Sequence, residues 1–410
     1  QRLEPLAKAI RRQQLGDSQF PSLETIEPII ERYEQGKRLD QRLDFTDLLG
    51  LFAGWSFHCE GPRKVQPTGD VPDVPVWFFD EQQDTSALLN SVCTRLMTSA
   101  KWVYIAGDPF QALYGFAGAD PQYLLSYREL PGVKTKTMPR SWRCAEPIQR
   151  AGELCIKKTS NYFDRGIQPA SHSGEVRRWT RGQAFEKLRP APEEDWLLLA
   201  RTNHLARELS NWLNSHDIPW TSTRNGGWMR PKVLDACLTL QELRLGETVS
   251  GAAWAKLLQQ LPSSKAGTKL LERGTKKRFE HTEEQEQCFA IGLGQLRDCG
   301  ATDALCKRIE EGEAFGLLDG GDRFQRAMAR HGLDACSEPR IRVGTIHSAK
   351  GAEAEKVFLL TAVSEKIHHA RHAQESIDQE GRCWYVGATR AKRELHVVST
   401  NSPLRTTLFD

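Results

Sequence analysis

The feature that most constrains the fold is a short apolar segment, residues 76–79, that ends in the adjacent acids Asp80 and Glu81. A predicted helix over residues 87–98 follows, and then a second apolar segment at residues 102–106. The order of strand, polar loop, helix and strand predicts a parallel α/β sheet. In such sheets the chemistry lies at the carboxyl ends of the strands.

Further short, mostly apolar segments, each followed by a polar or glycine-containing turn, predict the strands of a second sheet at residues 175–180, 196–200, 341–345, 357–360 and 395–399. Residues 1–50 predict helices, because apolar residues recur at three- and four-residue steps. The proline- and glycine-rich residues 59–75 predict a loop. Residues 232–338 show helical periodicity without a strand signal, which predicts a helical insertion in the second sheet.

Composition excludes several classes of protein. The net charge of +3 is too small to indicate nucleic acid by itself, so any basic surface has to be local. The ten cysteines include no C-x-x-C pair, which predicts neither a metal site nor a disulfide framework. No apolar run approaches the ~20 residues of a membrane helix. We therefore expect a cytoplasmic protein without a membrane partner.

The acids after the first strand suit nucleotide hydrolysis. One carboxylate, Asp80, can hold Mg²⁺ through its waters, while its neighbour, Glu81, orients or deprotonates the attacking water. Taken alone, such a pair is more often a strand end with solvated acids.

The second strand runs into a segment with two further candidates. Gln111 is a neutral amide that can hydrogen-bond a γ-phosphate and so sense its loss. Tyr114 and Phe116, with a glycine between them, can present ring faces to bases, each worth ~1–3 kcal/mol. Two core aromatic residues and a turn are the alternative for this pair.

Together these segments resemble motifs II and III of the UvrD/Rep/PcrA family of superfamily 1 helicases, as DEQQD followed by GDPFQALYGFAGAD. Five further segments resemble the family's elements in the family's order: LDFTDLL (43–49) from the return of domain 1B into 1A, MPRSWRC (138–144) from motif IV, LLARTN (198–203) from a DNA-contacting segment, VGTIHSAKGAEAEKV (343–357) from motif V, and EGRCWYVGATRAKREL (380–395) from motif VI.

The resemblance implies roles for individual residues. It assigns Mg²⁺ to Asp80, the hydrolytic water to Glu81, and coupling of the γ-phosphate to DNA to Gln111. Arg143 and Arg390 match two arginines that reach the γ-phosphate, where a guanidinium offers permanent charge and fork geometry. The other matches are Trp142 to an adenine-stacking tyrosine, Glu353 to a ribose-binding glutamate, Gly351 to the motif V nucleotide-binding segment, and Tyr114, Phe116, Arg201, Asn203 and His347 to DNA-facing positions.

The chain departs from the family in several places. No G-x-x-x-x-G-K-[ST] phosphate loop occurs, so we expect this chain alone not to hydrolyse ATP and to need a missing amino-terminal segment or a complementary chain. Ala117 stands where motif III usually has an arginine, and the predicted insertion is shorter than the family's 2B domain. Within the insertion, the basic segment 265–278 either tracks duplex phosphates or is a solvated loop.

The predicted fold is α/β, with two RecA-like P-loop NTPase motor domains, the first incomplete, and helical insertions. The predicted segments are a 1B-like helical remnant (1–44), the carboxy-terminal part of 1A (45–131), the first part of 2A (132–231), a reduced 2B-like insertion (232–338) and the second part of 2A (339–410). The expected function is an ATP- and Mg²⁺-dependent DNA helicase or 3′–5′ single-strand translocase on single-stranded DNA and ss/ds junctions. Alternatives are a non-catalytic remnant that binds DNA or a partner, and the motor part of a helicase–nuclease; the sequence leaves open whether repair or replication is served.

Overall fold

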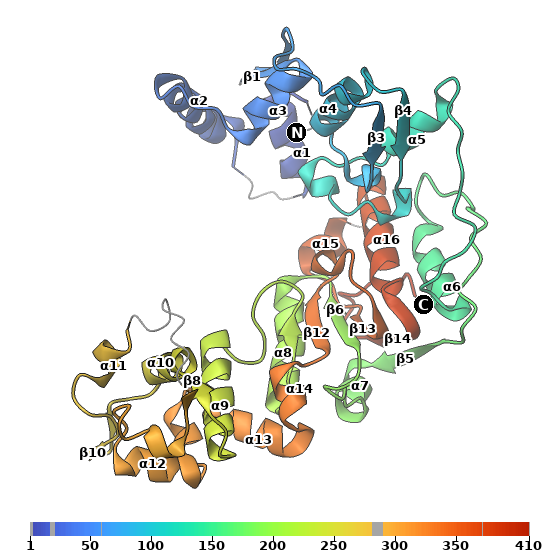
Figure 1. Ribbon diagram of the computed structural model, residues 1–410. Coiled ribbons are helices and arrows are strands. Elements are labelled where there is room, and N and C mark those ends of the chain that lie inside the picture. The colour runs from blue at the N-terminus through green and yellow to red at the C-terminus, as the bar shows by residue number, and fades with distance from the viewer. Residues whose placement is uncertain (1–2, 17–20, 59, 281–289, 371, 410) are drawn as a thin grey trace. The chain divides into compact units, whose positions relative to one another are not determined.

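The computed structural model describes residues 3–16, 21–58, 60–280, 290–370 and 372–409 (Figure 1). The chain divides into two compact units, which are described separately below. The first unit consists of residues 1–177 together with 361–410, and the second consists of residues 178–360. The division into five segments stays a prediction.

The first unit begins with helices, as predicted: α1 (Leu6–Gly16), α2 (Leu23–Leu39) and α3 (Phe45–Ala53). The start of α3 is fixed by a capping box, in which the side chain of Asp44 accepts from the backbone N–H of Asp47 and the side chain of Asp47 accepts from that of Asp44. Lys37 Nζ lies 2.7 Å from the Asp47 carboxylate, so the charge at this helix start is paired.

A hairpin follows, made of β1 (Trp55–His58) and β2 (Gly61–Lys64). The prediction of a loop over residues 59–75 is therefore wrong for residues 61–64. Pro62 lies opposite Phe57 in this two-stranded sheet. A strand at the edge of a sheet can tolerate proline, because an N–H that faces away from the partner strand is not needed for pairing.

The predicted strand–helix–strand unit is present. Strands β3 (Val76–Phe79) and β4 (Trp102–Ile105) pair in parallel, and α4 (Ala87–Met97) lies between them in the sequence. Phe79 lies opposite Ile105, so the residues that follow the two strands meet at one edge of the sheet. Short helical turns then carry the chain onward: η1 (Gln82–Asp84), η2 (Pro109–Gln111), η3 (Gly115–Ala117), α5 (Gln122–Ser126) and η4 (Tyr127–Glu129).

Two helices from distant parts of the sequence pack closely in the first unit. They are α6 (Glu146–Ile156) and α16 (Gln374–Ala388). A Cβ on Gly152 would lie 2.8 Å from Thr389 Cγ2, and one on Gly381 would lie 2.7 Å from the Cys155 carbonyl oxygen. Glycine at both positions therefore lets the backbones approach. The unit also contains α15 (Glu365–Ala370) and β14 (Ala391–Ser399).

The largest sheet has six strands in the order β5-β14-β13-β6-β12-β7, and its pairs β13–β6, β6–β12 and β12–β7 are parallel. The predicted strands β5 (Glu175–Thr180), β6 (Trp196–Ala200) and β12 (Ile341–Thr345) have the predicted bounds; the other two are the ends of the longer strands β13 (Ala354–Leu360) and β14. Every residue of β6 is buried, as expected for a central strand of a parallel sheet. The two-residue β7 (Thr221–Ser222) was not predicted.

In the second unit, α7 (Arg181–Lys187) and α8 (Asn203–Ser215) meet through Phe185 and Trp212, whose rings stack at 4.7 Å and also pack near Phe358 of β13. The α/β fold class is thus confirmed. None of the helices in the described residues is long and apolar enough to cross a membrane.

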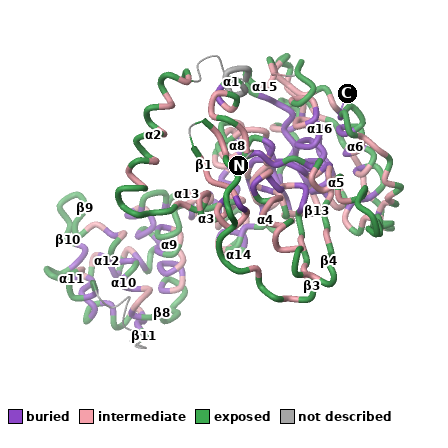
Figure 2. The backbone as a smooth tube through the Cα atoms, turned by 90° about the horizontal axis from the view of Figure 1, so that it is seen from above, coloured by how far each residue is buried: buried purple, intermediate pink, exposed green. Residues whose placement is uncertain are grey.

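The insertion after residue 231 is mainly helical, as predicted, and has its own hydrophobic core around Trp254, Phe315 and Phe324. Figure 2 shows buried positions along α9, α10 and α12. The helices are α9 (Pro231–Arg244), α10 (Gly251–Gln260), α11 (Thr275–Arg278), α12 (Asp303–Glu310), α13 (Gly321–His331) and α14 (Leu333–Ser337), with the turns η5 (Leu293–Gln295) and η6 (Glu313–Leu317).

The expectation that this insertion has no strands is wrong. Four two-residue strands form two antiparallel pairs: β8 (Val249–Ser250) with β11 (Ala290–Ile291), and β9 (Ser264–Lys265) with β10 (Thr268–Lys269). A two-residue strand is too short to show the alternation of apolar and polar residues by which strands are predicted.

Candidate active site

The two acids of the first unit lie in a turn directly after β3. The backbone N–H of Glu81 donates to Asp80 Oδ1 at 2.8 Å. Glu81 itself has φ +53°, a left-handed conformation that costs about 1–2 kcal/mol for a residue with a Cβ. Such conformations are concentrated at functional sites, where the surrounding structure holds them in place.

Gln83 connects the ends of β3 and β4. Its Nε2 donates to Glu81 Oε2 at 2.6 Å, and its Oε1 accepts from the backbone N–H of Asp108 at 3.1 Å. The side chain is buried, and Gly107 leaves room for it: a Cβ at residue 107 would lie 2.5 Å from Gln83 Oε1. Gln83 was not among the predicted site residues.

The close approach at Gly107 gives a prediction. We expect Gly107→Ala to destabilise the first unit by about 1–3 kcal/mol, because the added methyl group overlaps the buried Gln83 amide. Urea denaturation of the chain measures this loss. Gly36→Ala in α2 is the matched control: a Cβ there meets nothing within 4 Å, and alanine in a helix is expected to be neutral or slightly stabilising. Equal midpoints for the two variants would contradict the packing argument.

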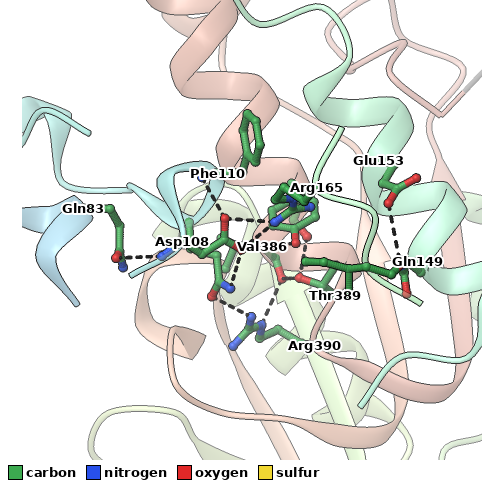
Figure 3. A network of polar contacts seen from close by, with 12 residues as sticks. Gln83, Asp108, Phe110, Gln149, Glu153, Arg165, Val386, Thr389 and Arg390 are labelled. Atoms are coloured by element: carbon green, nitrogen blue, oxygen red, sulfur yellow. Dashed lines mark hydrogen bonds and ion pairs between the residues drawn. The ribbon is translucent and has the colours of Figure 1, made fainter. Parts of the chain in front are cut away.

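The carboxylate of Asp108 is the centre of the next contacts (Figure 3). Its Oδ1 accepts from the Phe110 backbone N–H at 3.0 Å, and its Oδ2 accepts from Gln111 Nε2 at 2.9 Å. Arg165 Nη1 lies 2.9 Å from both oxygens, and the Tyr385 hydroxyl donates to Oδ2 at 3.3 Å. Neither Asp108 nor Arg165 was among the predicted site residues.

Gln111 and Arg390, both predicted site residues, are in direct contact. Arg390 Nη2 donates to Gln111 Oε1 at 3.2 Å, and its Nε donates to the Val386 carbonyl at 3.0 Å. Arg390 is only 1% exposed although it carries a permanent charge. Hydrogen bonds therefore run without interruption from Glu81 through Gln83, Asp108 and Gln111 to Arg390. We call these five residues the polar chain.

Two neighbours of Asp108, Arg165 and Tyr385, have raised pKa values. Burial lowers the pKa of Arg165, but the charge of Asp108 and the contact with Tyr385 outweigh it, so the pKa lies above its ordinary value. Burial, and next the Asp108 charge, raise the pKa of the Tyr385 hydroxyl. Arg165 is therefore a cation and Tyr385 a neutral donor near neutral pH.

The predicted stacking residues lie in exposed turns of the first unit. The Trp142 indole is 78% exposed, and Arg140 lies 5.8 Å from its ring centroid. The next residue, Arg143, is held by its backbone N–H, which donates to Ser141 Oγ at 3.3 Å. The role of the Arg143 side chain stays a prediction.

Tyr114 precedes the turn η3, and Phe116 lies within it. Their rings meet edge to face at 6.1 Å, and Phe116 is 68% exposed, so this pair is not the two core aromatic residues of the alternative. The loop that leads to them contacts the segment DEQQD (80–84): the Leu113 backbone N–H donates to Asp84 Oδ1 at 3.2 Å.

The second unit holds the other predicted residues. Arg201 directly follows β6 and Asn203 begins α8, while His347 begins the turn η7 (His347–Ala349) after β12. Ala200 pairs with Thr345, so these residues follow adjacent parallel strands at the same sheet edge. Gly351 has φ +82°, and the Glu353 carbonyl accepts from Arg342 Nη2 at 2.7 Å. Their DNA and nucleotide roles stay predictions.

Comparisons with known proteins agree with the sequence motifs. Residues 4–131 match the family model of the UvrD/REP helicase N-terminal domain, and residues 325–402 match that of the UvrD-like helicase C-terminal domain.

Three relatives illustrate the similarity. The chain is 22% identical to the putative ATP-dependent DNA helicase YjcD of Bacillus subtilis, over 90% of this chain and 57% of that protein. It is 27% identical to the ATP-dependent DNA helicase PcrA of Staphylococcus epidermidis, over 91% of this chain and 61% of PcrA. It is 25% identical to the ATP-dependent DNA helicase UvrD2 of Mycobacterium tuberculosis, over 78% of this chain and 46% of UvrD2.

The chain thus spans about half the length of these relatives. The match to the N-terminal domain covers Glu81 and Gln111, and the match to the C-terminal domain covers Arg390 at the other end of the polar chain. The chain belongs to the UvrD/Rep family of helicases.

Proposed function

We propose that this chain is part of a motor that hydrolyses ATP and moves along single-stranded DNA in the 3′–5′ direction, built on two RecA-like domains of which the first is incomplete here. The observation that carries the proposal is the polar chain, which joins the acids after β3 to the arginine after α16. The direction of movement rests on the family alone.

The polar chain gives a physical means of sensing a γ-phosphate. Arg390 rests on the neutral Oε1 of Gln111. A phosphate oxygen is a stronger acceptor for a guanidinium than an amide oxygen, because the hydrogen bond is then assisted by charge on both sides. Arrival of a γ-phosphate would therefore draw Arg390 from Gln111, and its loss would restore the contact. Gln111 is two residues before Leu113, whose loop leads to Tyr114 and Phe116, so the change can reach DNA-facing side chains.

The residues present suit ATP and Mg²⁺. Mg²⁺ is commonly held by one or two carboxylates with waters and substrate phosphates, so the adjacent Asp80 and Glu81 suffice without a larger acidic cluster. Asp80 would hold the ion, and Glu81 would accept the proton of the attacking water. The exposed Trp142 ring offers a flat apolar surface for the adenine base. Among the described residues no group of three His, Cys, Asp or Glu side chains could hold a metal ion by itself.

The exposed apolar side chains of the strand pair β3–β4 support the proposal that the first motor domain is incomplete here. Phe78, which is 73% exposed, stacks on exposed Tyr104 at 4.8 Å, and Val76, Trp102 and Val103 are also exposed. Parallel sheets occur almost only with both faces covered, and unpaired strand edges invite pairing. We propose that further polypeptide of the same protein, or a complementary chain, extends this sheet and supplies the phosphate loop. This chain alone is then expected to be inactive.

Substitution of Phe116 tests the proposal that this side chain binds single-stranded DNA. In the complete protein, Phe116→Ala is expected to weaken single-stranded DNA binding by about 10- to 100-fold, as for loss of one base–aromatic stack. Basal ATP hydrolysis without DNA is expected to stay unchanged. Fluorescence anisotropy with labelled oligo(dT) measures the binding. Phe45→Ala, at another exposed phenylalanine of the first unit, is the control. Equal DNA affinity for wild type and Phe116→Ala would remove Phe116 from the DNA path.

Two other functions are separated from the motor by one experiment. A remnant that only binds DNA or a partner would bind single-stranded DNA without any DNA-stimulated ATP hydrolysis in the complete protein. A helicase–nuclease motor would hydrolyse ATP and also cut DNA. The motor proposal predicts DNA-stimulated hydrolysis and no cutting, measured with phosphate release and a labelled single strand in Mg²⁺. Absence of stimulated hydrolysis would overturn it.

A further inference from the structure

Arg165 is a partly buried cation that lies outside all the motifs recognised in the sequence. It follows α6 by nine residues and precedes β5 by ten. Its side chain is 10% exposed, and its Nη1 lies 2.9 Å from both carboxylate oxygens of Asp108, 57 residues earlier in the chain (Figure 3). The guanidinium also lies over two rings, at 4.8 Å from the centroid of Phe110 and 5.2 Å from that of Tyr385.

These contacts decide how the Gln111 amide is oriented. Gln111 Nε2 donates to Asp108 Oδ2, which turns its Oε1 toward Arg390. An amide rotated by half a turn would place its NH₂ group against the Arg390 guanidinium, where two donors face each other. The useful orientation therefore requires Asp108 Oδ2 to stay in place as the acceptor for Gln111 Nε2.

Arg165 supplies the positive charge that holds the Asp108 carboxylate in this position. The other groups that hold the Asp108 carboxylate are neutral donors, namely the Phe110 backbone N–H, the Gln111 amide and the Tyr385 hydroxyl. Arg165 provides the positive charge within hydrogen-bond distance. The Asp108 side chain is 22% exposed. Without the Arg165 cation, this partly buried carboxylate would lack a charge partner inside the protein and would turn toward water.

We propose that Arg165 is a positioning residue, which holds Asp108 so that Gln111 presents its carbonyl oxygen to Arg390 and so couples the γ-phosphate to DNA. The proposal rests on the proposed motor function. It adds to that function a residue with no expected contact to nucleotide or DNA, acting through Asp108.

The test is a double-mutant cycle in the complete protein. Arg165→Met removes the charge and retains an unbranched apolar stem. We expect it to lower kcat of DNA-stimulated ATP hydrolysis by about 10- to 100-fold, the range for loss of a hydrogen bond to a charged group. KM for ATP is expected to change little, because the proposal places Arg165 behind Asp108 and not at the nucleotide. Arg165→Lys is expected to recover part of kcat, because it restores the charge without the fork geometry.

The cycle separates positioning from general stability. Gln111→Ala is expected to lower kcat, and Arg165→Met is expected to add no further loss in the Gln111→Ala background, because both changes break the same coupling. A purely structural role of Arg165 would give additive losses. Arg128→Met is the matched control, since Arg128 lies over the Phe163 ring at 5.1 Å but is exposed. Additive losses, or an unchanged kcat in Arg165→Met, would overturn the proposal.

A second measurement stands apart from ATP hydrolysis. A crystal structure of Arg165→Lys and of Arg165→Met, each in the 410-residue chain, is expected to show the Gln111–Arg390 contact retained in the lysine variant and lost in the methionine variant. Retention of the 3.2 Å contact in Arg165→Met would refute positioning even if the protein proved not to be a motor. Conversely, a lost contact in a protein without DNA-stimulated hydrolysis would support the positioning and reject the function.

Discussion

Glu81→Gln in the complete protein is expected to lower kcat for DNA-stimulated ATP hydrolysis by about 10²- to 10⁴-fold, the contribution of a general base. Glutamine has nearly the same shape as glutamate, and its Oε1 can still accept from Gln83 Nε2, which now contacts Glu81 at 2.6 Å. The left-handed turn at residue 81 is therefore expected to persist, while the proton acceptor is lost. Phosphate release measures kcat, and a fluorescent ATP analogue measures nucleotide binding, which is expected to stay close to that of the wild type.

The control for this variant is Glu129→Gln, which changes the same charge at an exposed glutamate of the first unit. It is expected to leave kcat unchanged. If Glu81→Gln turned over ATP as fast as the wild type, Glu81 would not be the residue that positions or deprotonates water.

Arg390→Ala is expected to have a larger effect, with hydrolysis slowed by about 10³- to 10⁵-fold, the range for arginines that stabilise phosphoryl transfer. The guanidinium is buried and its Nη2 donates to Gln111, so its removal takes away both the charge that we propose acts on the phosphate and the end of the polar chain. The measurement is kcat under single-stranded DNA saturation.

Two further variants separate loss of the Arg390 side chain's function from loss of folding. Arg390→Lys retains the charge and fills most of the buried space, but it cannot donate from the same positions to Val386 and Gln111. It is expected to fold and to remain strongly impaired. Arg393→Ala, in the exposed part of β14, is expected to hydrolyse ATP normally. Normal hydrolysis by Arg390→Lys would show that charge alone suffices and that the fork geometry has no role.

The sequence predicted the bounds of four strands. Strands β3 and β6 are short apolar runs between turn residues, which are typical of strands in parallel sheets. Strands β5 and β12 also have the predicted bounds, although each contains arginine. The hairpin strand β2 was not predicted, because Gly61 and Pro62 are typical of loops. They belong to a strand only because they pair with β1 in the folded chain. The two-residue strands of the insertion are too short to show an alternation of apolar and polar residues, so only their pairing in the folded chain identifies them.

The candidate site was predicted in part. Gln111 and Arg390 were predicted from motifs II to VI, and the structure brings them into contact. Asp108 and Gln83 lie within those motifs, but their roles depend on the meeting of two strand ends. The glycine before Asp108 was a usable signal, because a glycine close to a strand end often marks a place where another group approaches the backbone.

Arg165 could not have been predicted from the sequence. It is distant in the chain from the residues that it contacts, and a single arginine in a loop is more often a solvated surface residue. Only the folded chain places it beside Asp108.

The central claim is that the acids after β3 and the arginine after α16 act on one nucleotide. The most direct test is a structure of the complete protein with Mg²⁺ and a non-hydrolysable ATP analogue. The predicted result is Asp80 at the Mg²⁺ ion, Glu81 facing the γ-phosphate, and the Arg390 guanidinium moved from Gln111 Oε1 to a γ-phosphate oxygen. An analogue bound elsewhere, with Arg390 still donating to Gln111 at 3.2 Å, would contradict the account.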